Sequence, residues 1–319
     1  MNQGGIIPVC RSLAEIPADV GPTIAAIGNF DGVHRGHRQI LASTVAEARR
    51  RGVRAVALTF EPHPEQFLRP AQAPKRITPR DERLVLLAET GIDLIVVLRF
   101  DAAFAELSAR QFVEQILVRA LAVRGLHEGG SFRFGHRAQA GINELRDFGR
   151  EFGFGLTVHE PVCVHGLEVS SSAIRSLVSA GDMKRARWML GRPFVIRSTQ
   201  AQGRGVGSRL LVPTVNLAAY DGLLPAFGVY VTRLTIGERC FHSVTNVGNR
   251  PTFEGAGFSV ETHILNFEPV DLTEETPLEL EFLSYLREEI RFPSVDALKA
   301  QIGRDVARAK RYFRLIGVS

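Results

Sequence analysis

The sequence lacks the features typical of disulfide-rich secreted proteins, of proteins with cysteine-bound structural metals and of membrane proteins. It has only three cysteines, Cys10, Cys163 and Cys240, and their wide spacing and odd number argue against a disulfide framework and against a paired-cysteine metal site. No apolar run reaches the roughly 18 residues that a membrane span requires. The segment from Met1 to Glu15 also lacks a basic stretch followed by an apolar one. We therefore expect a cytoplasmic protein with reduced thiols and no membrane contact.

The composition of the chain indicates a soluble, globular protein. Of its 319 residues, 45% are hydrophobic and 23% are charged, a balance that disfavours disorder. At roughly 150 residues per domain, this length predicts about two domains. The 39 basic and 34 acidic residues give a net charge of +5, which suits anionic partners such as nucleotides. Because no RNP-type aromatic motif or zinc-finger spacing is present, nucleic acid is disfavoured as the partner.

In the first half of the chain, short β-rich runs alternate with helical stretches, the order typical of a parallel sheet covered by helices. This alternation predicts a Rossmann-like α/β domain over residues 1–190, and Gly191-Arg192-Pro193 ends its last helix. The expected strands are Thr23–Gly28, Val53–Phe60, Ile92–Leu98, Ala122–His127 and Gly155–Val162, and the expected helices are the segment from Ile40 to Ala48, Asp81–Glu89, Ala109–Arg119, Ser172–Ser179 and Met183–Leu190.

The second half changes to extended runs separated by Gly, Pro, Asn and Asp, which predicts an antiparallel β-barrel domain over residues 191–319. A helix over Ser294–Phe313 is expected to close it. The expected strands are Gly228–Ile236, Phe241–Val247, Phe258–Asn266 and Leu278–Tyr285. The apolar stripe of the closing helix is expected to pack into the core, and it consists of Val295, Leu298, Ile302, Val306, Ala309 and Phe313.

The most informative segment is Gly28-Asn29-Phe30-Asp31-Gly32-Val33-His34-Arg35-Gly36-His37, where the first strand passes to the first helix. Ligands of α/β sheets bind at such positions. The glycines permit tight turns, and a helix beginning near His37 directs free N–H groups at phosphate. His34 and His37 together suit the stabilisation of charge that develops on an α-phosphate during in-line attack.

This His-x-Gly-His segment resembles the nucleotidyltransferase superfamily, and specifically the prokaryotic bifunctional riboflavin kinase/FMN adenylyltransferase (FAD synthetase) family. Similar segments follow in order along almost the whole chain, which is more specific than any single motif. They are Thr59–Pro64, Phe132–His136, Ser170–Arg175, Leu190–Pro193, Pro213–Asn216, Gly228–Tyr230, Asn246–Phe253 and Val260–His263.

For the first domain, the resemblance implies transfer of AMP from ATP to FMN, with FAD and pyrophosphate as products and Mg²⁺ as the metal that neutralises the phosphates. It implies that Gly28, Phe30, Asp31, His34 and His37 form the ATP site, that Ser171, Ser172 and Arg175 hold the leaving phosphates, and that His63 lies near the flavin. For His63 alone, a structural role and a functional role remain equally open. One departure is Ser131, because the family usually carries Asp or Asn there.

For the second domain, the resemblance implies phosphorylation of riboflavin to FMN by ATP. Thr214 and Asn216 are two residues apart, so in an extended segment both point the same way and present oxygen ligands for Mg²⁺. The resemblance makes Glu261 the base that takes the proton of the ribityl hydroxyl. It also adds Gly203, Gly207 and Arg250 to the nucleotide site, whereas Glu261 taken alone is a commonplace outward-facing strand residue.

Departures in the kinase phosphate loop keep alternatives open. Where the family carries histidine, arginine and glycine, this chain has Gln202, Ser208 and Leu211. The leading interpretation is an enzyme with both activities that acts on riboflavin, FMN, FAD and ATP. An FMN adenylyltransferase with an impaired kinase domain and a non-catalytic flavin-binding paralogue are the alternatives. The sequence leaves the oligomeric state open.

Overall fold

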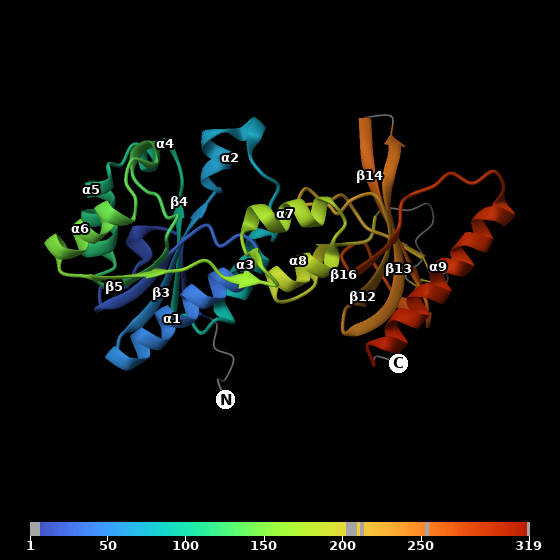
Figure 1. The fold of residues 1–319 in the computed structure, drawn as a ribbon, viewed down its shortest axis with the longest axis horizontal. Helices are drawn as coiled ribbons and strands as arrows, with labels where there is room; N and C mark the ends of the chain where they lie inside the picture. The colour runs from blue at the N-terminus through green and yellow to red at the C-terminus, as the bar shows by residue number, and fades with distance from the viewer. Residues whose placement is uncertain (1–6, 202–208, 211–213, 253–254, 318–319) are drawn as a thin grey trace. The chain divides into compact units, whose positions relative to one another are not determined.

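The computed structural model describes residues 7–201, 209–210, 214–252 and 255–317. Its contacts divide the chain into two compact units, Met1–Ser171 and Ser172–Ser319 (Figure 1). The domain boundary expected from the sequence, between residues 190 and 191, refers to domains that fold independently. A division by contacts does not test it, so it stays a prediction.

The first unit is built on a six-stranded parallel sheet in the order β1-β4-β3-β2-β5-β6. This order confirms the expected Rossmann-like α/β fold. The five expected strands are present with shifted ends, whereas β1 was not expected. The strands are β1 (Val9–Cys10), β2 (Thr23–Ile27), β3 (Arg54–Glu61), β4 (Leu94–Arg99), β5 (Val123–Gly129) and β6 (Gly155–His159).

The helices of this unit connect the strands and cover both faces of the sheet (Figure 1). They include α1 (Arg35–Arg51), α2 (Pro64–Leu68), α3 (Arg80–Ala88), α5 (Ala109–Phe112) with the π-helical continuation Val113–Ala120, and α6 (Ile142–Phe152). The short α4 (Ala102–Ala105) precedes α5. Like β1, the helices α2, α4 and α6 were not predicted from the sequence.

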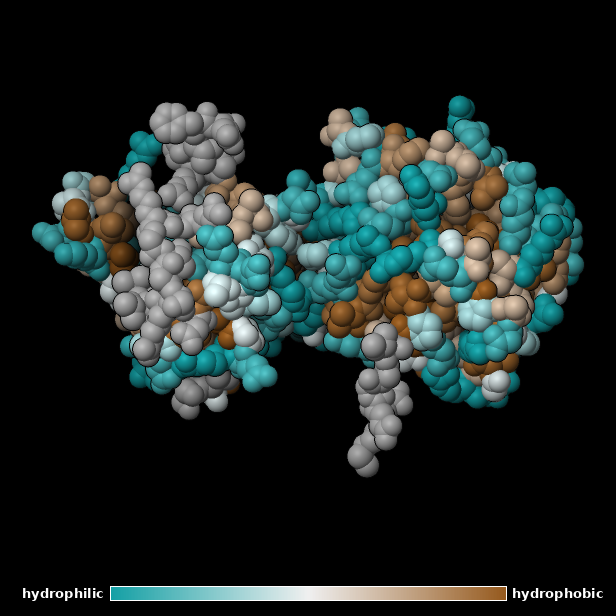
Figure 2. All heavy atoms as spheres, turned by 180° about the vertical axis from the view of Figure 1, so that it is seen from behind, coloured by the Kyte–Doolittle hydropathy of each residue, from teal (hydrophilic) through white to brown (hydrophobic). Residues whose placement is uncertain are grey.

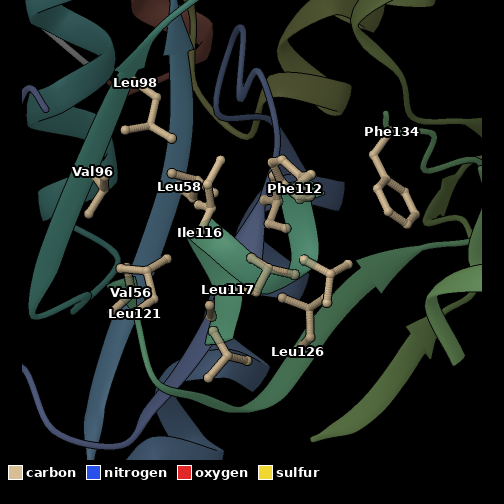
Figure 3. Packing of buried hydrophobic residues seen from close by; sticks show 14 of the residues in the cluster. Val56, Leu58, Val96, Leu98, Phe112, Ile116, Leu117, Leu121, Leu126 and Phe134 are labelled. Atoms are coloured by element: carbon tan, nitrogen blue, oxygen red, sulfur yellow. The ribbon is translucent and has the colours of Figure 1, made fainter. Parts of the chain in front are cut away.

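Side chains of the central strands point alternately to the two faces of the sheet, and a hydrophobic core lies on each face. Val56 and Leu58 of β3 pack with Ile116 of the π-helical segment on one side (Figure 3). Ala55 and Ala57 of the same strand point to the other side, toward α1 and α3. Because successive side chains of a strand face opposite ways, a run that is buried on both faces reads as continuously apolar in the sequence.

The strand order also fixes where a ligand can bind. The chain passes from β2 through α1 to β3 on one side, and after β4 it returns to pair β5 with the other side of β2. The carboxyl ends of β2 and β5 therefore form the topological switch point, beyond which open α/β sheets bind their ligands.

The second unit begins within α7 (Ser171–Ser179), includes α8 (Met183–Leu190) and continues as an antiparallel sheet in the order β11-β14-β13-β12-β16-β9. Backbone contacts of Gln200 with Leu217 and of Ala201 with Asn216 link the two edges. This confirms the expected antiparallel barrel architecture. Its strands are β9 (Phe194–Ser198), β11 (Thr214–Asn216), β12 (Gly228–Ile236), β13 (Arg239–Thr252), β14 (Gly255–Ile264) and β16 (Leu278–Arg287). Two small two-stranded sheets pair β7 (Cys163–Val164) with β8 (Leu167–Glu168) in the first unit, and β10 (Arg209–Leu210) with β15 (Val270–Asp271) in the second.

The closing helix is present as α9 (Val295–Leu315), but the expectation that its whole stripe is core was wrong. Ala309 and Phe313 are buried, and the Phe313 ring stacks on His242. Val295, Leu298 and Ile302 are instead 66%, 40% and 42% exposed. A helix of this length spans about 30 Å, and only the part after the buried ion pair of Asp305 with Arg287 packs into the core of the barrel. The free end of α9 shows as a mixture of hydrophobic and hydrophilic surface at the left edge of Figure 2.

Candidate functional sites at the switch point and on the barrel

The turn that follows β2 is tight and buried. Phe30, Gly32 and Val33 have positive φ angles of 48°, 87° and 37°. Such angles are costly for a bulky or β-branched side chain. Phe30 and Val33 are 2% and 0% exposed, so packing holds them there. Backbone strain that is maintained by its surroundings is a frequent property of functional sites.

The helix α1 begins at Arg35, earlier than the expected start near His37, because His34 caps it. The His34 Nδ1 atom accepts the His37 backbone N–H at 3.3 Å. The two imidazole rings stack with centroids 3.5 Å apart and planes 17° apart. The Phe30 ring meets His37 edge-on at 5.4 Å. The sequence motif thus brings both histidines to one helix N-terminus.

His37 is held in its neutral form. Burial lowers its pKa well below the usual value for histidine, and the neighbouring His34 lowers it further. Its Nδ1 atom is buried and has no hydrogen-bond partner among the described residues. Buried polar atoms of this kind are rare unless a ligand or water pairs with them. The neutral ring therefore keeps hydrogen-bonding capacity for a bound molecule next to the N-terminus of α1, where the helix dipole favours an anion.

Asp31 fixes the turn from within the protein. Its buried carboxylate accepts the backbone N–H groups of Ile77 and Thr78 at 3.1 Å, which ties the turn to the segment before α3. The Ser171 hydroxyl donates to the Asp31 carbonyl at 2.9 Å. Both residues were predicted as ligand contacts, and in the structure both also hold the backbone of the turn.

A buried arginine that the sequence did not reveal braces the same turn. Arg83 of α3, with a side chain 4% exposed, donates to the carbonyls of Asn29 at 2.8 Å and Phe60 at 3.2 Å. It also pairs with Glu61 at 3.1 Å, and Glu61 pairs with Arg76 at 2.6 Å. Burial lowers the pKa of Arg83, although Glu61 opposes that shift. An arginine on a helix is ordinarily solvated, so no sequence signal marked it.

The other residues predicted for the first site lie on α2 and α7. The His63 Nδ1 atom accepts the Glu65 N–H at 3.2 Å and caps α2, which gives this residue a structural contact. Ser171 and Arg175 are four residues apart on α7, so their side chains share a helix face, and Ser172 is exposed. Ser131 is exposed in the loop after β5.

On the barrel, the residues predicted for the second site share one face of three neighbouring strands. Asn216 of β11 lies opposite Glu261 of β14, which lies opposite Asn246 of β13. Thr214 is two residues from Asn216 on the same face, while the intervening Val215 is fully buried. Directly opposed side chains lie about 5 Å apart at Cβ. One carboxylate and several oxygen and amide groups thus gather on this face.

The face extends to a residue that the sequence did not suggest. The Asn246 side chain donates to Glu289 at 3.4 Å, and a Cβ on Gly248 would lie 2.5 Å from a Glu289 oxygen. Gly203 and Gly207 lie outside the described residues, as do Gln202, Ser208 and Leu211. For Arg250 the structure describes the backbone, which pairs with Gly257 in β13–β14.

The described residues contain neither a membrane-spanning helix nor a cluster of metal-binding side chains. Within these ranges no helix is long and apolar enough to cross a membrane. The same ranges hold no group of three or more His, Cys, Asp or Glu side chains arranged to bind a metal ion.

Comparison with known proteins identifies both units. The family described as FAD synthetase matches residues 16–173, and the family described as riboflavin kinase matches residues 190–313. The bifunctional riboflavin kinase/FMN adenylyltransferase of Escherichia coli K12 is 36% identical over 92% of this chain and 93% of its own length. The enzyme of the same name from Pseudomonas fluorescens is 38% identical over 94% and 96%.

A solved structure shares the fold over nearly the whole length. The crystal structure of a macrolide-efflux protein from Streptococcus pneumoniae superposes with a TM-score of 0.82 and 25% identity, covering 96% of this chain and 99% of that protein. Because one fold hosts many functions, this likeness supports the fold and does not by itself indicate a function. From the two domain matches and the full-length relatives, the chain belongs to the family of bifunctional riboflavin kinase/FMN adenylyltransferases.

Proposed function

We propose that this protein makes both flavin cofactors, phosphorylating riboflavin to FMN in the barrel unit and adenylylating FMN to FAD in the α/β unit. The matches to both families and the relatives with this pair of activities support it. The observation that carries the adenylyl-transfer half is the stacked His34–His37 pair at the N-terminus of α1. ATP is the co-substrate of both reactions, and the free thiols of the three cysteines suit the cytoplasm.

In adenylyl transfer, a phosphate oxygen of FMN attacks the α-phosphorus of ATP and the bond to pyrophosphate breaks. The N–H groups of α1, with the positive end of the helix dipole, bind phosphate oxygens. His34 and His37 donate to the oxygens on which charge increases in the transition state. Gly28 and Phe30 shape the ATP site, and Ser171, Ser172 and Arg175 bind the departing pyrophosphate. No covalent intermediate with the protein is required.

In riboflavin phosphorylation, the Glu261 carboxylate accepts the proton of the ribityl hydroxyl as its oxygen attacks the γ-phosphorus of ATP. Glu261 and Asn216 are opposed on adjacent strands, so the base and the phosphate-side ligands are close together. Gly203, Gly207 and Arg250 complete the nucleotide site in this proposal.

The donor set of the barrel face fits Mg²⁺. Thr214 supplies a hydroxyl and Asn216 an amide oxygen on the same face, and Mg²⁺ prefers such hard oxygen ligands together with substrate phosphates. When bound, the ion neutralises charge on the phosphates of ATP.

Two reactions followed in parallel test this proposal. The purified protein is incubated with ATP and Mg²⁺ and with either riboflavin or FMN, and the three flavins are separated chromatographically over time. We expect FMN and then FAD from riboflavin, and FAD from FMN. FAD from FMN alone would refute the kinase half and leave an adenylyltransferase with an impaired kinase. Flavin binding without either conversion would favour the non-catalytic paralogue.

Variants assign the two sites, since each reaction serves as the control for the other. His37→Ala should lower FAD formation by about 10²–10³-fold and leave riboflavin phosphorylation unchanged. Glu261→Gln should lower phosphorylation by about 10²–10⁴-fold and leave FAD formation from FMN unchanged. A loss of both activities in either variant would contradict the separation of the sites.

A further inference from the structure

A buried carboxyl group lies at the switch point itself. Glu128 is the penultimate residue of β5 and is 2% exposed. Its Oε1 atom accepts the backbone N–H of Ile27, the last residue of β2, at 2.8 Å. In the part of the chain that the structure describes, no basic side chain pairs with Glu128. Buried carboxyl groups without a basic partner are rare, so this placement calls for a reason.

The hydrogen bond replaces a missing step of the sheet. The register of β2 with β5 ends at the pair Ala26–His127, where the two strands diverge. The N–H of Gly28 points the other way and bonds to Leu58 of β3 at 3.0 Å. Successive N–H groups of a strand alternate in direction, so the N–H of Ile27 points to β5. The Glu128 side chain supplies the acceptor that the diverging backbone no longer offers.

The surroundings favour the uncharged acid. Burial raises the pKa of Glu128 well above the usual value for glutamate, and the Ile27 N–H offsets only part of that shift. Titratable groups on the neighbouring elements have partners of their own. His127 bonds to Glu47 and to His159, Arg110 bonds to Glu114 and to Glu151, and His34 stacks on His37. None of these groups hydrogen-bonds to Glu128.

We propose that Glu128 is a positioning residue of the adenylyl-transfer site, whose carboxyl group holds the N–H of Ile27 and with it the backbone from which the Gly28–His34 turn departs. The inference rests on the proposed adenylyl transfer. An uncharged group also suits this place electrostatically, because a carboxylate would repel the phosphates of ATP and FMN. As the pH rises through the folded-state pKa of Glu128, the buried carboxylate forms and FAD formation falls.

Three variants test the role. Glu128→Gln keeps an oxygen for Ile27 and is uncharged at every pH, whereas Glu128→Leu removes the acceptor. Glu144→Gln is the matched control, because Glu144 accepts the Gly141 N–H at 2.7 Å in an exposed helix cap. FAD formation from FMN and ATP is measured from neutral to alkaline pH. Riboflavin phosphorylation and thermal unfolding are followed on the same samples to detect misfolding.

We expect Glu128→Gln to retain FAD formation at neutral pH. At alkaline pH its rate of FAD formation should fall less than that of wild type. Glu128→Leu should lower kcat/KM for FAD formation by about 10–100-fold, because displaced catalytic groups are costly, with phosphorylation unchanged. Glu144→Gln should behave as wild type. The inference is overturned if Glu128→Gln loses as much activity as Glu128→Leu, or if Glu128→Leu stays fully active.

An infrared measurement separates failure of this inference from failure of the proposed function. The carbonyl stretch of a protonated carboxylic acid should be present in wild type at neutral pH and absent in Glu128→Gln, whatever the enzyme does. Absence of that difference overturns the inference even if FAD forms. Wild-type protein that shows the band but makes no FAD refutes the proposed adenylyl transfer, and with it the positioning role.

Discussion

Removing the guanidinium of Arg83 should destabilise the first unit and weaken adenylyl transfer together. In Arg83→Leu, the carbonyls of Asn29 and Phe60 lose the Arg83 donors at 2.8 and 3.2 Å, and the Asn29 carbonyl keeps only the long bond from the Thr59 hydroxyl at 3.4 Å. Glu61 keeps Arg76 at 2.6 Å, so its charge is not left unpaired. Each stranded buried carbonyl costs about 1–3 kcal/mol. The variant no longer has the desolvation cost of a buried guanidinium, which offsets part of this. The free energy of unfolding should therefore fall by about 3 kcal/mol.

For a unit of this size, such a loss corresponds to a fall in Tm of about 6–12 °C. Calorimetry of the full chain and FAD formation from FMN are the measurements. Arg49→Leu is the matched control, because Arg49 grips Asp93 with two bonds of 2.6 and 2.7 Å but its side chain is 53% exposed. An exposed pair contributes at most about 1 kcal/mol. Equal shifts in Tm for the two variants would refute the reasoning that burial decides the cost.

Two further predictions concern the second unit and the histidine pair. Asp305→Ala removes the partner of Arg287, held at 2.8 Å with the Asp305 side chain 3% exposed, and should destabilise the barrel unit by about 3–5 kcal/mol; calorimetry in which its transition does not move would contradict this. For His37, a pKa lowered by burial means that the unfolded chain binds a proton more readily than the folded one, so stability falls as the pH drops below about 6.5 toward the folded-state pKa. Urea unfolding at a series of pH values should show a shallower acid slope for His37→Gln than for wild type, and equal slopes would contradict the assignment.

The sequence predicted the parallel sheet well because its central strands are buried on both faces. Runs such as Val53–Phe60 are mostly apolar, with only Arg54 and Thr59 as exceptions, and they differ from the observed β3 only at the ends. The missed helix α6 contains Gly149, which lowers helix propensity. A Cβ there would lie 2.8 Å from the carbonyl of Phe154, so the glycine is required by close packing. Local propensity alone does not reveal such a tertiary requirement.

The residues of the candidate site could be predicted where they lie in a recognisable sequence motif. His34 and His37 are three residues apart, so one motif displays both. Arg83 and Glu128 reach the same turn from other elements, at sequence separations of 54 from Asn29 and 101 from Ile27. Charged residues on helices and strands are ordinarily exposed. Only the fold shows that these two are buried.

These separate contacts together explain why a strained turn can present two histidines in one arrangement. Phe30 and Val33 remain at positive φ only if their surroundings over-determine the backbone. The backbone between Ile27 and Asp31 is held from four elements: by Glu128 of β5, by Arg83 of α3, by Ser171 at the start of α7, and by the Asp31 carboxylate reaching the segment before α3. Loss of one brace leaves the others in place, so we expect graded effects on adenylyl transfer rather than unfolding. The same His-x-Gly-His motif in an unbraced loop would lack the fixed geometry that transition-state stabilisation requires.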